Sequence, residues 1–158
     1  MEPKKPILAK DDNVNATEMA KMVLEKSGLY AVKMRAPEKK SILVIDDNVN
    51  ASQMAKMILE KTGLYTVSLC NRGSEAFQIV QDTQPELVLL DIVMPDADGT
   101  DIANRIQKDK SLTRTGVIFM TALVAKTESL IGGHAFIAKP ISAEILLKRV
   151  KAFFEARN

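Results

Sequence analysis

The sequence predicts an α/β fold in which a parallel sheet of five strands is covered by helices on both faces. From residue 41 onward, short and almost continuously apolar runs alternate with segments of helical periodicity. Runs that are apolar throughout are typical of parallel strands, which are buried on both sides. The chain has 158 residues, 46% of them hydrophobic, which is enough for one full core but hardly for two. Strand–helix alternation of this kind predicts crossover connections within a single sheet.

Five strands and five helices are expected. The strands are the apolar runs at residues 41–45, 65–70, 86–90, 116–121 and 135–138. The first helix follows from the apolar spacing of residues 51, 54, 55, 58 and 59, with Gly63 as its stop. The others are expected at residues 75–82, at 100–108, weakly near 126–131, and after the candidate N-cap Ser142 with Leu146, Val150, Phe153 and Phe154 on its inner face.

Part of this pattern is written twice. Residues 7–34 align without gaps to residues 42–69, and 19 of the 28 positions are identical. Residues 35–40 bridge the two copies, and nothing after residue 70 is duplicated. Repeat architectures need several units, so the pattern indicates a partial duplication rather than a repeat array.

Charge and cysteine content exclude several classes of function. The net charge is +2, and Lys and Arg are not clustered among aromatic residues, so we expect no direct contact with nucleic acid. The single cysteine, Cys70, excludes an internal disulfide and fits a reducing compartment. No apolar stretch approaches the roughly 18 residues that span a bilayer, and the N-terminus does not have the pattern of a signal peptide. We therefore expect a cytoplasmic protein without a membrane partner.

Polar residues stand where the expected strands end. Asp46 and Asp47 follow the first strand, Asp91 follows the third, Thr121 ends the fourth and Lys139 follows the fifth. In parallel sheets ligands bind outside these carboxyl ends. If the first and third strands are neighbours, three carboxylates converge and repel one another unless a cation joins them, and oxygen ligands select Mg²⁺ or Mn²⁺.

This set of groups suits phosphoryl transfer. An aspartate carboxylate can act as the nucleophile and form an acyl phosphate. The charge on the transferred group then needs a metal, an ammonium and a hydroxyl, and Lys139 and Thr121 would supply the last two. Asp46-Asp47 alone could be a solvated strand end, and residues 94–99 alone read as a Pro/Gly turn. Their combination at ordered strand ends favours a functional site.

With these motifs, residues 41–158 resemble the receiver domain of two-component response regulators, which has the flavodoxin-like fold with strand order 2-1-3-4-5. The resemblance implies that a histidine kinase or histidine phosphotransfer protein donates the phosphoryl group, and that a downstream protein target reads the changed surface. It implies these roles: Asp91 as phosphoacceptor, Asp47 as direct Mg²⁺ ligand, Asp46 as a ligand through water, the Val93 backbone carbonyl as a further ligand, Thr121 and Phe136 as switch residues, Ala122 as the small neighbour that admits the phosphoryl group, and Lys139 as its ammonium contact.

Two features qualify the expected behaviour. Val93 and Leu123 are apolar at the positions that would flank an attacking water, so we expect slow self-dephosphorylation and no turnover enzyme. The stretch from Thr121 to Lys139 is about four residues shorter than is usual for the family, roughly one helical turn. This shortening falls on the family's usual output face, from the fourth helix to the fifth strand.

Two other classes of function compete with this interpretation. The chain could be an unphosphorylated interaction module in which residues 1–38 exchange between copies and form a swapped homo-oligomer. A haloacid-dehalogenase-like phosphatase also uses an aspartate nucleophile, but it needs a second Asp two residues further on, where this chain has Asn48 or Val49.

The first copy is a poor candidate for the core. Lys10 stands where the second copy has Ile45, and Ala9 where it has Val44. Burying an unpaired ammonium there would cost several kcal/mol. We therefore expect residues 41–158 to form the domain, and residues 1–38 to be an appendage, to pack on the sheet edge, or to exchange with another molecule.

Overall fold

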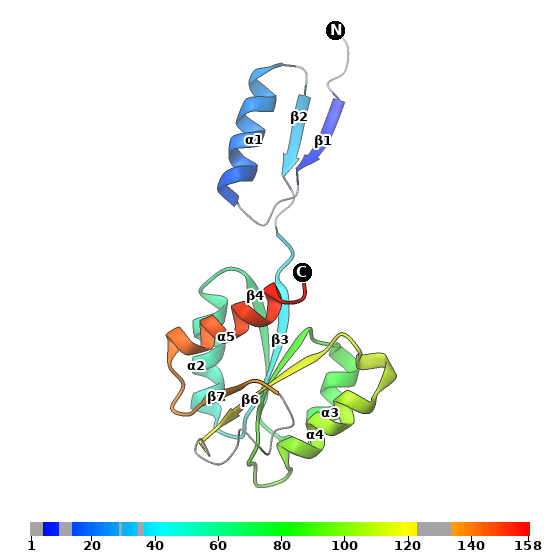
Figure 1. The fold of residues 1–158 in the computed structure, drawn as a ribbon, viewed down its shortest axis with the longest axis vertical. Coiled ribbons are helices and arrows are strands. Elements are labelled where there is room, and N and C mark those ends of the chain that lie inside the picture. Colours follow the sequence, from blue (N-terminus) through cyan, green and yellow to red (C-terminus); the bar gives the residue numbers. More distant parts are fainter. Residues whose placement is uncertain (1–4, 10–13, 29, 35–36, 123–133) are drawn as a thin grey trace. The chain divides into compact units, whose positions relative to one another are not determined.

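A computed structural model describes residues 5–9, 14–28, 30–34, 37–122 and 134–158 (Figure 1). The chain divides into an N-terminal unit, Met1–Glu38, and a C-terminal unit, Lys39–Asn158. The expected short helix near residues 126–131 and the apolar Leu123 lie outside the described residues.

The sheet of the C-terminal unit has the predicted topology. Its strands are β3 (Lys40–Ile45), β4 (Tyr65–Cys70), β5 (Leu87–Asp91), β6 (Gly116–Thr121) and β7 (Phe136–Ala138). They lie in the order β4-β3-β5-β6-β7, and every neighbouring pair is parallel. Counted within this unit, that is the order 2-1-3-4-5, so the predicted fold class is confirmed.

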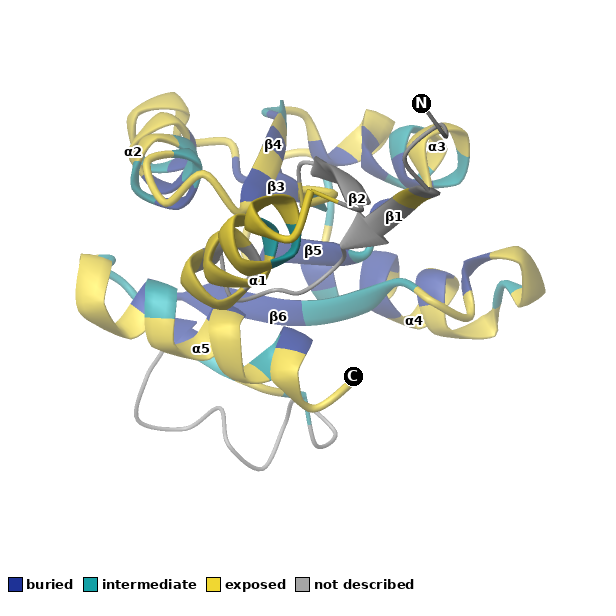
Figure 2. Ribbon diagram, turned by 90° about the horizontal axis from the view of Figure 1, so that it is seen from above, coloured by how far each residue is buried: buried dark blue, intermediate teal, exposed yellow. Residues whose placement is uncertain are grey.

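Helices cover both faces of this sheet. The helices are α2 (Val49–Glu60), α3 (Gly73–Thr83), α4 (Gly99–Lys108) and α5 (Ala143–Glu155), with a 3₁₀ turn η1 (Lys110–Leu112). The core on one face joins the sheet to α2 and α5, and the core on the other joins it to α3 and α4. Figure 2 shows the buried strands between helices whose outer sides are exposed. Helices α3 and α4 begin two and one residues earlier than expected, at glycines.

The strand register brings the polar residues to one end of the sheet. Ile45 pairs with Leu90, so Asp46 and Asp91 are the next residues on two adjacent strands. Thr121 pairs with Ala138, which places Lys139 directly after the neighbouring strand. The carboxylates were predicted to converge if the first and third strands are neighbours. They do so because β3 lies beside β5.

Helix ends are set mainly by side chains and by glycine. The Asn48 side chain accepts a hydrogen bond from the Ala51 N–H (3.0 Å) and caps α2. Gly63 follows this helix with a φ of 76°, the left-handed conformation that glycine adopts without strain. Ser142 stands at the predicted N-cap of α5, but its side chain makes no capping hydrogen bond.

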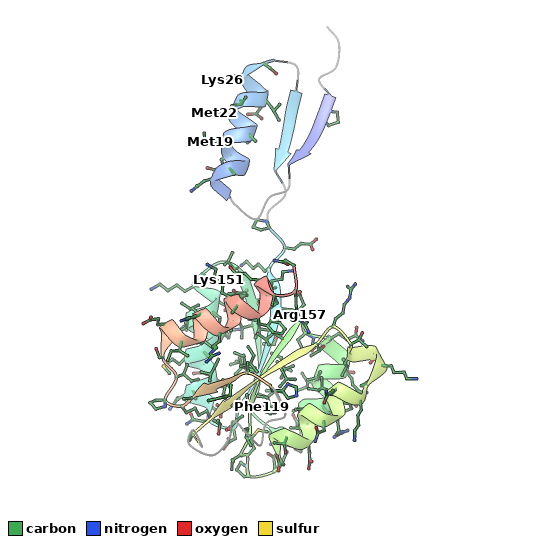
Figure 3. The ribbon with its side chains drawn as sticks, viewed as in Figure 1. Met19, Met22, Lys26, Phe119, Lys151 and Arg157 are labelled. Carbon is green, nitrogen blue, oxygen red and sulfur yellow. The ribbon has the colours of Figure 1, made fainter. Side chains whose placement is uncertain are left out.

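The N-terminal unit has the same element order as the start of the sheet. Strand β1 (Lys5–Ala9), helix α1 (Val14–Lys26) and strand β2 (Tyr30–Met34) form a two-stranded parallel pair. Lys5 pairs with Tyr30 in this unit, and Lys40 pairs with Tyr65 in the larger sheet. The two registers are therefore the same after a shift of 35 residues. Met19 and Met22 lie on the side of α1 away from this pair (Figure 3).

The apolar face of α1 is less covered than that of its counterpart. Met19 and Val23 are 66% and 65% exposed, whereas the equivalent Met54 is 41% exposed and Ile58 is partly buried. Met22, at 54%, is instead less exposed than its equivalent Met57, at 74%. Ala20 is exposed in α1, whereas the equivalent Ala55 of α2 is fully buried. A lone strand–helix–strand element has no second helix to cover this side. In the described part of the chain, no helix combines the length and apolarity that crossing a bilayer requires.

Two substitutions that place a residue of the first copy at the equivalent position of the second should differ greatly in their effect on stability, because only one of them lies at the buried end of β3. Ile45 is fully buried, so Ile45→Lys should lower the free energy of unfolding by several kcal/mol. Ile58 is only partly buried, so Ile58→Val should cost roughly 1 kcal/mol or less. Urea denaturation followed by circular dichroism measures both. Equal losses would contradict the predicted difference between the two positions.

Candidate functional site

Three carboxylates meet at the carboxyl ends of β3 and β5. Asp46 is fully buried and Asp91 is 7% exposed, whereas Asp47 is exposed. One oxygen from each lies within 4.8 Å of the other two. The structure therefore brings together the three carboxylates that the sequence predicted as metal ligands.

Backbone and side-chain donors hold Asp46 in place. Its Oδ1 accepts a hydrogen bond from the Asn48 N–H at 2.9 Å, and its own N–H donates to the Cys70 carbonyl at 3.1 Å. Its carbonyl accepts from Nδ2 of Asn71 at 2.7 Å. Burial and three hydrogen bonds make this residue the most tightly held of the three.

Lys139 lies between the two buried carboxylates. Its ammonium is 2.6 Å from Oδ2 of Asp46 and 3.2 Å from Oδ2 of Asp91. The contact with Asp91 is also a hydrogen bond, but the contact with Asp46 has the distance of an ion pair without the angles of a hydrogen bond. At 2.6 Å the attraction between the charges dominates whatever the angle. The Lys139–Pro140 peptide bond is cis.

Burial and charge shift the pKa values of this group. Burial, reinforced by the neighbouring charge of Asp46, raises the pKa of Asp91 from 3.8 to about 6, although Lys139 and the Val93 N–H oppose the shift. Burial lowers the pKa of Lys139, but its contacts with Asp46 and Asp91 outweigh burial and leave that pKa raised. Lys139 thus stays charged at neutral pH, and Asp91 is ionised there less completely than an exposed aspartate.

The donor set fits a small divalent cation. Three carboxylates face one ammonium, so a net negative charge remains when all are ionised. Oδ2 of Asp46 is buried and has no hydrogen-bonded partner among the described residues. Oxygen donors of this kind suit Mg²⁺ or Mn²⁺. The Val93 N–H donates to Oδ1 of Asp91 (3.3 Å), and the role of its carbonyl stays a prediction.

The other predicted residues border the carboxylates. Thr121 is buried at the end of β6, and its carbonyl accepts the Lys139 N–H at 2.8 Å. Ala122 is exposed and, with Lys139, lines an open hollow of about 500 Å³. Phe136 on β7 is partly buried and packs against the core beneath α3 and α4. This position of Phe136 is explained equally well by packing in the core and by the predicted role as a switch residue.

Comparison with known proteins decides the family. The sequence model of the response regulator receiver domain family matches residues 42–151. The chain belongs to the response regulator receiver domain family. The polar-differentiation response regulator DivK of Brucella ovis is 32% identical over 85 residues, which are 51% of this chain and 69% of that protein.

Solved structures match a similar share of the chain. A putative response regulator from Chloroflexus aurantiacus is 24% identical with a TM-score of 0.67, and the match covers 73% of this chain and 97% of that one. A response regulator from Desulfuromonas acetoxidans is 27% identical with a TM-score of 0.66, covering 74% and 98%. These likenesses place the receiver fold in the C-terminal unit, which makes up about that share of the chain.

The sequence alone did not indicate the roles of two residues of this receiver domain, Asn71 and Gly99. Asn71 donates to Oγ of the buried Ser52 (2.9 Å) as well as to the Asp46 carbonyl. Gly99 was interpreted as a turn residue, but a Cβ there would lie 2.1 Å from the Asp91 carbonyl oxygen, so close approach requires glycine. Asn71 lies just beyond the duplicated segment, so the comparison of the two copies gives no signal for it.

The raised pKa of Asp91 predicts a pH-dependent stability for the metal-free receiver domain. The folded domain keeps a proton on Asp91 up to about pH 6, whereas the unfolded chain releases it near pH 4. The stabilisation is complete below pH 4 and lost as pH rises through 6. Asp91→Asn removes this loss, so the variant should be more stable at pH 7.5 by about 1–3 kcal/mol.

Thermal or urea denaturation in EDTA between pH 4 and 8 measures this effect. The difference between Asp91→Asn and the unaltered domain should shrink as pH falls toward 4, since groups shared by both proteins cancel in it. A difference that does not change with pH would contradict the prediction.

Proposed function

We propose that this receiver domain takes a phosphoryl group on Asp91 from a histidine kinase or histidine phosphotransfer protein, with Mg²⁺, and signals through a changed protein-binding surface. The observation that carries the proposal is the convergence of Asp46, Asp47 and Asp91 within 4.8 Å, with Lys139 in contact with two of them. Membership of the receiver family supports a phosphoacceptor role in two-component signalling.

Each residue has a distinct part in the proposed transfer. An oxygen of Asp91 forms a bond to phosphorus while the P–N bond of the donor phosphohistidine breaks and its electron pair stays on the imidazole. Asp46, Asp47, Asp91 and the Val93 carbonyl would hold Mg²⁺, which when bound neutralises charge on the phosphoryl oxygens. Lys139 already contacts Asp91 and would donate to the transferred group. Ala122 leaves room for that group.

A protein that donates the phosphoryl group could reach this site through the open hollow beside Lys139. The hollow beside Lys139 is bordered by Met54 of α2 and by Ile141, which follows β7. Met54 and Met57 are 41% and 74% exposed on the outer side of α2. Exposed apolar side chains beside a charged site suit a partner that excludes water during the transfer.

The signal is proposed to pass through Thr121 and Phe136. Thr121 ends the strand next to Asp91, and β6 pairs directly with β7, which carries Phe136. A phosphoryl group on Asp91 would draw the Thr121 hydroxyl as a donor. Phe136 would then change its packing at the edge of the sheet, where a downstream protein can bind.

The proposal predicts Mg²⁺-dependent modification of one residue. Beryllofluoride with Mg²⁺ should bind, and acetyl phosphate should add one phosphoryl group to the unaltered chain, as measured by intact-mass spectrometry. Asp91→Ala should abolish both, because Asp46 and Asp47 are proposed to hold Mg²⁺ and not to accept the phosphoryl group. Asp101→Ala, an exposed aspartate of α4, is the matched control and should leave both unchanged.

Absence of binding, or binding that persists in Asp91→Ala, would overturn the receiver mechanism. The phosphorylated sample also reports the proposed lack of turnover. Val93 is 63% exposed and apolar, so it offers an attacking water no hydrogen bond from its side chain. The phosphoryl group should therefore persist for minutes or longer, and a half-life of a few seconds would contradict slow self-dephosphorylation.

A second candidate function concerns the N-terminal unit. Its exposed Met19, Met22 and Val23 favour assembly, either by exchange with another copy or by contact between copies. In this alternative the duplicated segment acts without phosphorylation.

Removal of residues 1–38 tests the assembly role. Size-exclusion chromatography with light scattering should show a concentration-dependent oligomer for the full chain and a monomer for the deletion variant. Two monomers at every concentration would end the assembly hypothesis and leave the proposed phosphorylation untouched.

A further inference from the structure

The start of α3 is capped from a distant part of the chain. The two carboxylate oxygens of Asp96 accept hydrogen bonds from the backbone N–H groups of Gly73 (3.1 Å) and Ser74 (3.0 Å). Arg72, at the N-cap position itself, makes no capping hydrogen bond with its side chain. The Ser74 backbone contact is the main reason that the pKa of Asp96 is lowered. Asp96 thus fills the cap position of a helix that begins more than twenty residues before it.

Asp96 belongs to the segment that follows the phosphoacceptor. This segment, residues 92–98, starts beside Asp91 and closes on itself, because Gly99 donates its N–H to the Ile92 carbonyl (2.8 Å). Val93 bridges to Asp98 in the same loop, so its backbone is held on both sides. The loop also packs tightly on α3, since a Cβ on Gly73 would lie 2.6 Å from Cβ of Ala97.

Asn71 links the start of α3 to Asp46, the buried carboxylate at the end of β3. It precedes α3 by two residues, and its side chain donates to the Asp46 carbonyl (2.7 Å) and to Oγ of Ser52 (2.9 Å). Residues 71–74 therefore contact the Asp46 end of β3 through Asn71 and the loop after Asp91 through Asp96.

We propose that Asn71 and Asp96 are positioning residues that hold the two halves of the cation site at the right separation. The inference rests on the proposed function, because it concerns the site that would hold Mg²⁺ through Asp46, Asp47, Asp91 and the Val93 carbonyl. Asp96 acts through the loop that carries Val93, and Asn71 acts through the backbone of Asp46. Neither touches the cation or the phosphoryl group.

Removal of the Asp96 carboxylate should weaken cation binding without removing a ligand. Groups that orient metal ligands typically change affinity by about tenfold or more, so Asp96→Ala should weaken Mn²⁺ binding roughly tenfold. Asp96→Asn keeps one acceptor oxygen and should lose less. Asn71→Ala should lose a similar amount to Asp96→Ala. Electron paramagnetic resonance of free Mn²⁺, titrated into the full-length chain, measures each affinity, and Mg²⁺ competition extends it to Mg²⁺.

Asp109→Ala is the matched control. Asp109 is a half-buried aspartate that caps η1 through the Ser111 N–H (2.8 Å), and its pKa is also lowered. It precedes β6, whereas Thr121 and the carboxylates lie at the other end of that strand. Both variants should lose a similar small amount of thermal stability, but Asp109→Ala should bind Mn²⁺ like the unaltered chain.

Phosphorylation kinetics separate positioning from chemistry. With acetyl phosphate, Asp96→Ala should need more Mg²⁺ to reach half of its maximal rate but should reach nearly the same maximal rate. Unchanged Mn²⁺ affinity in Asp96→Ala, or an equal loss in Asp109→Ala, would overturn the positioning role. A chain that binds Mn²⁺ with this pattern but is never phosphorylated would overturn the proposed function alone. A chain that binds no Mn²⁺ would overturn both.

Discussion

Two buried carboxylates, Asp46 and Asp91, repel each other at the carboxyl end of the sheet, and the surrounding groups of the site are arranged around this repulsion. Pairing of β3 with β5 places Asp46 and Asp91 side by side at the end of the sheet, where little water can screen them. Lys139 offsets part of this repulsion because its ammonium contacts both. One ammonium cannot neutralise three carboxylates, so the site favours a further cation, and Asp91 keeps a raised pKa without one.

This imbalance connects the fold to the proposed phosphoryl transfer. A site that is too negative when empty binds Mg²⁺ readily, and the bound cation makes room for the added charge of a phosphoryl group. The groups that would receive this charge already lie around Asp91, with Lys139 in contact and Thr121 at the end of the adjacent strand. Few side chains need to move, which is the preorganisation that transfer chemistry requires.

The two copies of the repeated segment differ at a position that is fully buried in the receiver domain. Ile45 is buried beneath α3 and α4, and the first copy has Lys10 at this position. Asn71, whose side chain holds the Asp46 backbone, follows the second copy and has no counterpart in the first. The first copy keeps the residues that make a strand–helix–strand element and lacks those that join such an element to a larger sheet. This contrast explains why residues 42–69 occupy the interior of the sheet.

The sequence by itself determined the strands, most helices and the main site residues, because each depends on local pattern or on a position at a strand end. Apolar runs marked β3 to β7, and Asp46, Asp47, Asp91, Thr121 and Lys139 stood directly at their ends. Only the tertiary structure decided which strands are neighbours, that Lys139 contacts both Asp46 and Asp91, and that Asp96 caps α3. It also showed that Ser142 stands at an N-cap without a side-chain hydrogen bond. These contacts join residues far apart in the chain, often through backbone groups that every residue carries, so no local pattern can specify them.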